Sequence, residues 1–129
     1  MGAEDNRIEY SGDELRLYWR QKSWTMPVAE ITRIDICVMA DPIHHGDETF
    51  HIVRGASRFW LLGHNLYSGG AVVERLQTEH PEIPCCDMAV FNLSWRLRGA
   101  PILGIRFFPI PGVGEFPLKA LPRMEAVQA

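Results

Sequence analysis

The stretch RIDICVMADPIHHGDETFHIVRGASRFWLL, residues 33–62, decides the fold. Apolar and polar residues alternate over Arg33–Met39 and again over Thr49–Arg54, and a period of two is typical of strands. Between these segments, Asp41–Glu48 breaks the alternation with Pro, Gly and Asp, which are residues that turns favour. Arg58–Leu62 is a further strand with nearly apolar faces. We therefore expect a hairpin followed by a third strand.

The residues before this stretch follow the same period. Short strands are predicted over Arg7–Tyr10, Glu14–Arg20 and Ser23–Val28. In the second of these, Leu15 and Leu17 lie on one face and polar residues lie on the other. The first half of the chain is therefore predicted to consist of short, sequentially paired strands.

After residue 63 the period changes to that of a helix. Val72, Val73 and Leu76 recur at helical spacing, and Ser68 stands where an N-cap is expected. The helix should end before Pro81, because proline disfavours helical geometry in the residue that precedes it.

The remainder of the chain is less regular. Residues 87–98 fit both a helix and an alternating strand, and both alternatives stay open. Residues 104–110 are predicted to form a last strand. Residues 109–129 are rich in Pro and Gly, so we expect an extended or partly disordered tail there.

Bulk composition limits the class of protein. The chain has 129 residues, 47 % of them hydrophobic and 22 % charged, as expected of one soluble globular domain. The formal net charge of −3 gives no general footprint for nucleic acid, so we expect no such partner. No apolar run approaches the ~18 residues that span a bilayer, so membrane insertion is not expected either. Three cysteines, an odd number, favour free thiols in a reducing cytoplasm.

These elements predict an α+β protein. We expect a small antiparallel β-barrel or sandwich with one C-terminal amphipathic helix and an extended tail. A single globular domain is predicted over residues 1–108, with the Pro/Gly-rich tail over residues 109–129.

Element order adds a resemblance. The step MPVAEI (residues 26–31), the hairpin formed by FHIV (50–53) and FWLL (59–62), and the helix end LQTEHP (76–81) resemble a bacterial PH-like domain over about residues 7–83. The resemblance implies a PH-like barrel and raises the question of lipid binding. Inositol phosphates would require Lys and Arg in the first hairpin turn. That turn is the acidic Ser11–Glu14, so binding of such lipids is not expected.

The turn within the opening stretch carries the first chemical candidates, which are His44, His45, Asp47, Glu48 and His51. Two imidazoles and a carboxylate would suffice for zinc. However, adjacent histidines on a strand point to opposite faces, and no spacing here puts two imidazoles on one face. A polar hairpin turn, an exposed binding loop and a metal site are the alternatives, and we predict no metal ligands.

No residue pattern typical of an active site is present. Cys85 and Cys86 stand beside Glu82 and Asp87, and acidic neighbours disfavour the reactive thiolate. The chain has no serine nucleophile elbow. We therefore expect a protein that is not an enzyme and that needs no cofactor.

Arginine and aromatic residues provide the second set of candidates. Tyr18 and Trp60 fall on strand faces opposite Leu17 and Leu61. Together with nearby arginines they could form a patch of the kind enriched in protein interfaces. The alternative is that the fold buries both faces of these strands. The candidate patch consists of Arg16, Tyr18, Arg20, Arg58 and Trp60.

These observations predict a cytoplasmic protein that binds another protein. A concrete version is a bacterial inhibitor of the immunity type, which blocks a cognate partner. The expected partner-binding residues are Arg16, Tyr18, Arg20, His44, His45, Asp47, Glu48, Arg58 and Trp60. The alternative is a small-ligand or metal-binding protein that uses the His44–His51 loop.

Overall fold

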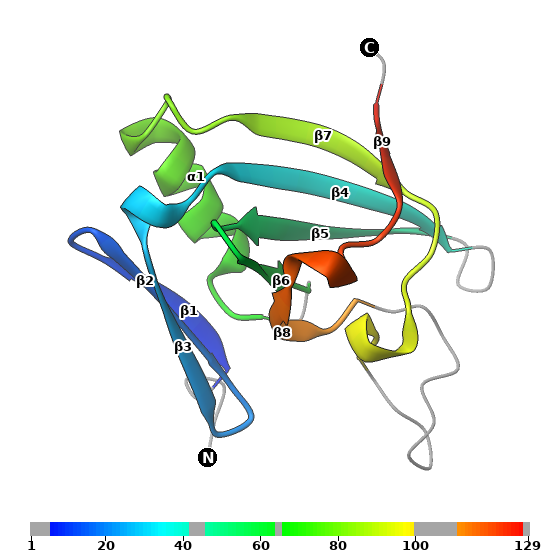
Figure 1. Cartoon of the computed structure of the whole chain (residues 1–129), viewed down its shortest axis with the longest axis horizontal. Coiled ribbons are helices and arrows are strands. Elements are labelled where there is room, and N and C mark those ends of the chain that lie inside the picture. Colours follow the sequence, from blue (N-terminus) through cyan, green and yellow to red (C-terminus); the bar gives the residue numbers. More distant parts are fainter. Residues whose placement is uncertain (1–5, 42–45, 64–65, 100–110, 128–129) are drawn as a thin grey trace.

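The computed structural model describes residues 6–41, 46–63, 66–99 and 111–127. Within these residues nine strands form two sheets, and one α-helix lies in the middle of the chain (Figure 1). The predicted α+β class is confirmed. The predicted barrel is wrong for the described residues, because their strands form two separate sheets that do not close on themselves.

The first sheet contains three antiparallel strands in the order β1-β2-β3, which are β1 (Arg7–Ser11), β2 (Glu14–Trp19) and β3 (Lys22–Pro27). The turn between β2 and β3 has two residues, Arg20 and Gln21, with φ of 48° and 68°. Positive φ at both positions matches the twist of the flanking strands and gives a tight hairpin. The three predicted strands are confirmed.

The second sheet contains six strands in the order β8-β6-β5-β4-β7-β9 (Figure 1). β4 and β7 pair in parallel, and the other neighbouring strands are antiparallel. The parallel pair departs from the predicted all-antiparallel pattern. The strands are β4 (Arg33–Asp41), β5 (Gly46–Arg54), β6 (Arg58–Leu62), β7 (Cys85–Val90), β8 (Val113–Pro117) and β9 (Met124–Ala126).

The central hairpin of this sheet is the one that the opening stretch predicts. β4 and β5 pair from Arg33 opposite Arg54 to Asp41 opposite Gly46, so both strands extend further toward the turn than the alternation indicates. Residues 42–45, which include His44 and His45, lie outside the described residues.

The helix α1 (Gly69–Glu79) is confirmed where helical spacing predicts it, with Val72, Val73 and Leu76 buried. The prediction that this helix is the C-terminal element of the fold is wrong, because β7, β8 and β9 follow it in the chain. Ser68 is the N-cap residue, but it has a φ of 71° and its side chain makes no capping hydrogen bond.

The segments after the helix join the second sheet. The ambiguous residues 87–98 contain the end of β7, a loop and the short 3-10 helix η3 (Trp95–Leu97). In the segment expected to be a tail, β8 pairs with β6 and β9 pairs with β7. Two further 3-10 turns are η2 (Val28–Glu30) and η4 (Leu118–Ala120). The strand predicted over residues 104–110 lies outside the described residues.

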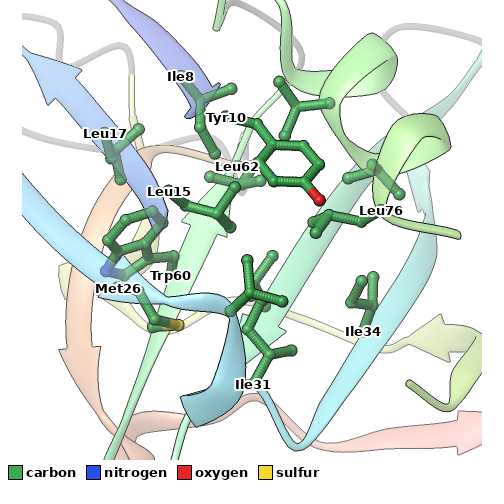
Figure 2. Packing of buried hydrophobic residues seen from close by; sticks show 14 of the residues in the cluster. Ile8, Tyr10, Leu15, Leu17, Met26, Ile31, Ile34, Trp60, Leu62 and Leu76 are labelled. Atoms are coloured by element: carbon green, nitrogen blue, oxygen red, sulfur yellow. The ribbon is translucent and has the colours of Figure 1, made fainter. Parts of the chain in front are cut away.

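Both faces of the six-stranded sheet are covered. Figure 2 shows the first core cluster, in which Leu15 and Leu17 from β2 pack with Trp60 and Leu62 from β6 and with Leu76 from α1. A second cluster covers the opposite face, with members from β4 to β7 and from the segment that contains η3. Its buried residues are Cys37, Met39, Phe50, Ile52, Phe59, Leu61, Met88, Val90, Leu93 and Leu97. Burial on both sides explains why β6 is almost wholly apolar.

One charged side chain lies inside this sheet. Asp35 on β4 is fully buried and accepts hydrogen bonds from Nε of Arg33 and Nε of Arg54, each at 2.6 Å. Paired guanidinium groups offset the cost of burying a carboxylate. Burial, together with the charge of Asp35, raises the pKa of the neighbouring Cys37 thiol to about 12.

Candidate functional site

A cleft of about 300 Å³ opens where the turn end of the β2–β3 hairpin faces β8 and η3. We call it the hairpin cleft. Its residues come from three places that are far apart in sequence. They are Trp19, Arg20, Lys22 and Trp24 from the hairpin, Arg96, Leu97, Arg98 and Gly99 from η3 and the residues after it, and Gly112, Val113, Gly114, Glu115 and Phe116 from β8 and its approach.

Aromatic rings line the interior of the hairpin cleft. Trp19 and Trp24 are half-buried and extend the first core cluster toward the surface, while Phe116 extends the second. Gly114 has no side chain, and a Cβ at this position would lie 3.5 Å from the ring of Phe116 and 3.9 Å from that of Trp24. The glycine therefore keeps space open between the aromatic rings.

Four cationic side chains line the same cleft, and they differ in whether their charge already has a partner. They are Arg20, Lys22, Arg96 and Arg98. Arg20 lies over the Trp19 ring at 5.4 Å from its centre. Arg98 donates from Nε to the carbonyl oxygen of Leu93 at 2.7 Å. Lys22 and Arg96 are exposed, and neither has an ion-pair partner within the described part of the chain. Free cations beside aromatic rings provide an attractive surface for anionic groups.

The single carboxylate among the described lining residues is already neutralised. Glu115 accepts hydrogen bonds from Nη1 of Arg58 at 2.7 Å and from Nε1 of Trp60 at 2.8 Å. Arg58 also donates to both carboxylate oxygens of Glu30, each at 2.9 Å. Hydrogen bonds from Arg58 lower the pKa of Glu30, and those to Glu30 raise the pKa of Arg58. The hairpin cleft therefore carries a net positive charge.

Two of the predicted patch residues belong to the interior of the protein. Trp60 is fully buried, so its prediction as a surface residue is wrong. It lies on β6, which has neighbouring strands on both sides and core clusters on both faces. Arg58 is only one-quarter exposed and is held by Glu30 and Glu115. Both residues donate hydrogen bonds to Glu115 and so hold one lining residue of the hairpin cleft in place.

Of the other three patch residues, Arg16 and Tyr18 lie together, but away from Arg20 and the hairpin cleft. Arg16 and Tyr18 alternate with the buried residues of β2 and so lie on the outer face of the three-stranded sheet. Arg16 pairs with Glu14 at 2.8 Å, and Arg7 lies over the Tyr18 ring at 4.2 Å from its centre. Of the predicted patch, Arg20 is the member that reaches the hairpin cleft.

The histidine-bearing turn is only partly described. Asp47 and Glu48 lie on β5, opposite Ala40 and Met39 of β4. His51 is half-buried on the same strand, and burial lowers its pKa. The described residues contain no group of three side chains that could hold a metal ion.

Sequence reasoning missed most of the hairpin cleft. Trp19 directly precedes a two-residue turn, and Trp24 lies three residues after it, opposite Leu17. Recognising that turn would have placed both rings near one end of the hairpin. Arg96 and Phe116 belong to segments whose secondary structure the sequence left open or assigned to a tail. Trp95 directly precedes Arg96 in the chain. It is 55 % exposed and presents a large aromatic surface.

Comparison with known protein families, curated proteins and solved structures gave no match to this chain. Within the described residues, no helix has the length and apolar character that a membrane crossing requires. The described lining of the hairpin cleft contains no His, Cys, Ser or Thr side chain. This arrangement of rings and cations is suited to binding apolar and anionic groups.

Proposed function

We propose that this chain is a non-enzymatic protein-binding domain that recognises its partner through the hairpin cleft. The observation that carries this is the combination of Trp19 and Trp24 with the exposed, unengaged charges of Lys22 and Arg96 among the described residues. Tryptophan and arginine dominate the binding energy of protein interfaces. A half-buried ring supplies apolar contact area at a low cost in side-chain entropy.

In its narrowest form, this is a bacterial inhibitor of the immunity type, acting in the cytoplasm by occupying a cognate partner. The free thiols Cys37, Cys85 and Cys86 support a reducing compartment. The PH-like resemblance over residues 7–83 stays a prediction. The small-ligand or metal-binding alternative relies on His44 and His45, which lie outside the described residues, so no observation favours it.

Co-purification tests the proposed function. Tagged wild-type protein from its native cell should retain one stoichiometric partner. The double variant Lys22→Glu/Arg96→Glu should lose at least about tenfold of that affinity, because charge reversal at an interface repels a complementary surface. Lys119→Glu, an exposed charge reversal on η4, is the matched control and should retain the partner.

Two results would contradict the proposal. Failure of the wild-type protein to retain any specific partner would remove the assignment as a binding protein. Equal retention by the wild type and the double variant would place the interface elsewhere. Arg16→Glu then tests the outer face of the three-stranded sheet.

A further inference from the structure

Among the described residues, no strand pairs with the outer edge of β8, and the hairpin cleft contains this edge. Just before β8, the edge is already occupied, because the Gly112 N–H donates to the Leu97 oxygen at 2.9 Å. β8 is the terminal strand of the six-stranded sheet and pairs with β6 on one side. Two main-chain hydrogen bonds fix which residues of β8 face β6. The Gly63 N–H donates to the Gly112 oxygen at 3.0 Å, and the Leu118 N–H donates to the Ser57 oxygen at 3.4 Å.

Hydrogen-bonded pairs in an antiparallel ladder recur at every second residue. Gly114 and Phe116 are therefore the residues of β8 that bond to β6, opposite Leu61 and Phe59. The main-chain N–H and C=O groups of Val113 and Glu115 point the other way. No acceptor for either N–H is found among the described residues.

Both of these residues line the hairpin cleft. An unpaired strand edge is a template for another strand, and peptide ligands often bind by adding to such an edge. Main-chain hydrogen bonds then supply affinity, and pockets for alternate side chains supply specificity. The hairpin cleft thus offers a backbone template as well as a side-chain surface.

The charge and size of the hairpin cleft indicate what would bind there. Arg20, Lys22, Arg96 and Arg98 surround it, and Glu115 is neutralised by Arg58. A volume of about 300 Å³ is at the lower end for ligand pockets, so it suits one anchoring side chain of a partner. The rings of Trp24 and Phe116 favour an apolar or aromatic anchor.

We infer that the hairpin cleft takes an extended acidic segment of a partner protein, added as a strand to β8. The carboxylates of the segment face the four cations, and one aromatic side chain enters between the rings. This inference rests on the proposed function and names the kind of partner. Single-stranded nucleic acid also favours rings and cations. The free N–H and C=O groups of a strand edge match a peptide backbone better, so nucleic acid is an outcome of the test.

The probe is a fluorescein-labelled acidic peptide, DEDFEDE, titrated with the full chain and followed by fluorescence anisotropy at low salt. The neutral counterpart NQNFQNQ should bind at least about tenfold more weakly, because it keeps the shape and loses the charges. Lys22→Glu/Arg96→Glu should weaken binding of the acidic peptide by a similar factor. Lys119→Glu should stay within about twofold of wild type, since it lies outside the cleft lining.

Two N-methylated forms of the acidic peptide test strand addition itself. One carries methyl groups on the amide nitrogens of odd positions and the other on those of even positions. Only alternate N–H groups of an added strand face its neighbour. One form should therefore bind like the parent peptide, and the other should lose most of its affinity.

Three outcomes would overturn the inference. They are equal binding of the acidic and neutral peptides, equal effects of the two methylated forms, and tighter binding of a charge-matched oligothymidylate than of the acidic peptide. If any occurs while the wild-type protein still retains a specific partner, this inference fails and the proposed function stands. Absence of any specific partner rejects the proposed function instead.

Discussion

At the scale of single residues, Glu115 links the core to the hairpin cleft. It accepts a hydrogen bond from the buried indole of Trp60 and pairs with Arg58, which also holds Glu30. The same carboxylate lies on β8, whose main chain lines the cleft. Core packing and the position of the cleft wall are therefore connected through one side chain.

Replacing this carboxylate should cost stability. Glu115→Ala leaves the buried Trp60 N–H without its acceptor and removes one partner of Arg58, so we expect a loss of about 1–3 kcal/mol in the free energy of unfolding. Glu14→Ala is the matched control. Its ion pair with Arg16 is exposed, so it should cost about 0.5 kcal/mol or less. Urea denaturation of both variants measures the difference, and equal losses would show that the Glu115 contacts contribute no more than an exposed ion pair.

His51 should make stability depend on pH. Burial lowers its pKa in the folded protein, while the unfolded chain has the ordinary value of ~6.5. Near and below pH ~6.5, His51 therefore binds more protons in the unfolded state than in the folded state. Its contribution to the free energy of unfolding is complete above pH ~6.5 and is lost as the pH falls. As the pH falls from about 7.5 to 5.5, the free energy of unfolding should decrease, and His51→Gln should reduce this decrease. Urea denaturation at the two pH values gives the comparison. An identical decrease in wild type and variant would contradict this role.

Local patterns predicted inward-facing residues well and surface residues poorly. Alternation placed Leu15 and Leu17 on one face of their strand, and both are buried. It could not show that Trp60 is buried, because both faces of β6 are covered by segments distant in sequence. A period of two identifies a face without saying what covers the opposite one.

At the scale of elements, the start of α1 departs from the expected cap. Ser68 occupies the N-cap position in left-handed geometry and makes no side-chain hydrogen bond to the helix. A side chain in that geometry cannot contribute what a capping serine usually does. The short helix is held mainly by the burial of Val72, Val73 and Leu76.

Ser68→Ala should therefore have little effect. A capping serine typically contributes about 1 kcal/mol, and we expect a loss of about 0.3 kcal/mol or less here. Leu76→Ala, which removes a fully buried side chain from the first core cluster, should cost about 2–5 kcal/mol. Thermal or urea unfolding of the two variants tests this pair. A loss near 1 kcal/mol for Ser68→Ala would indicate that the serine caps the helix after all.

The first six strands and α1 could be predicted from the sequence. Alternation indicated the first five strands, a short apolar run indicated β6, and helical spacing indicated α1. The later strands could not. β7 is short and fits two periods, and its parallel pairing with β4 depends on a crossover that no local signal encodes. β8 and β9 lie in a Pro/Gly-rich segment, and their pairing partners are distant in the chain.

At the scale of the whole molecule, the candidate site is a product of topology. Closure of the hairpin cleft requires the end of the β2–β3 hairpin, η3 and the edge strand β8 to meet. The sequence supplied the residue types, arginine and tryptophan. Among the predicted partner-binding residues that the structure describes, Arg20 is the one that lines the cleft. Arg16 and Tyr18 remain on a separate face.

The central claim is that a partner protein occupies the hairpin cleft, and photo-crosslinking in the native cell tests it most directly. A photoreactive amino acid is placed at Arg96, at Lys119 or at Arg16 in otherwise identical tagged chains. Irradiation should give one specific covalent adduct from position 96 and none from position 119. An adduct from position 16 or 119, with none from position 96, would contradict the claim.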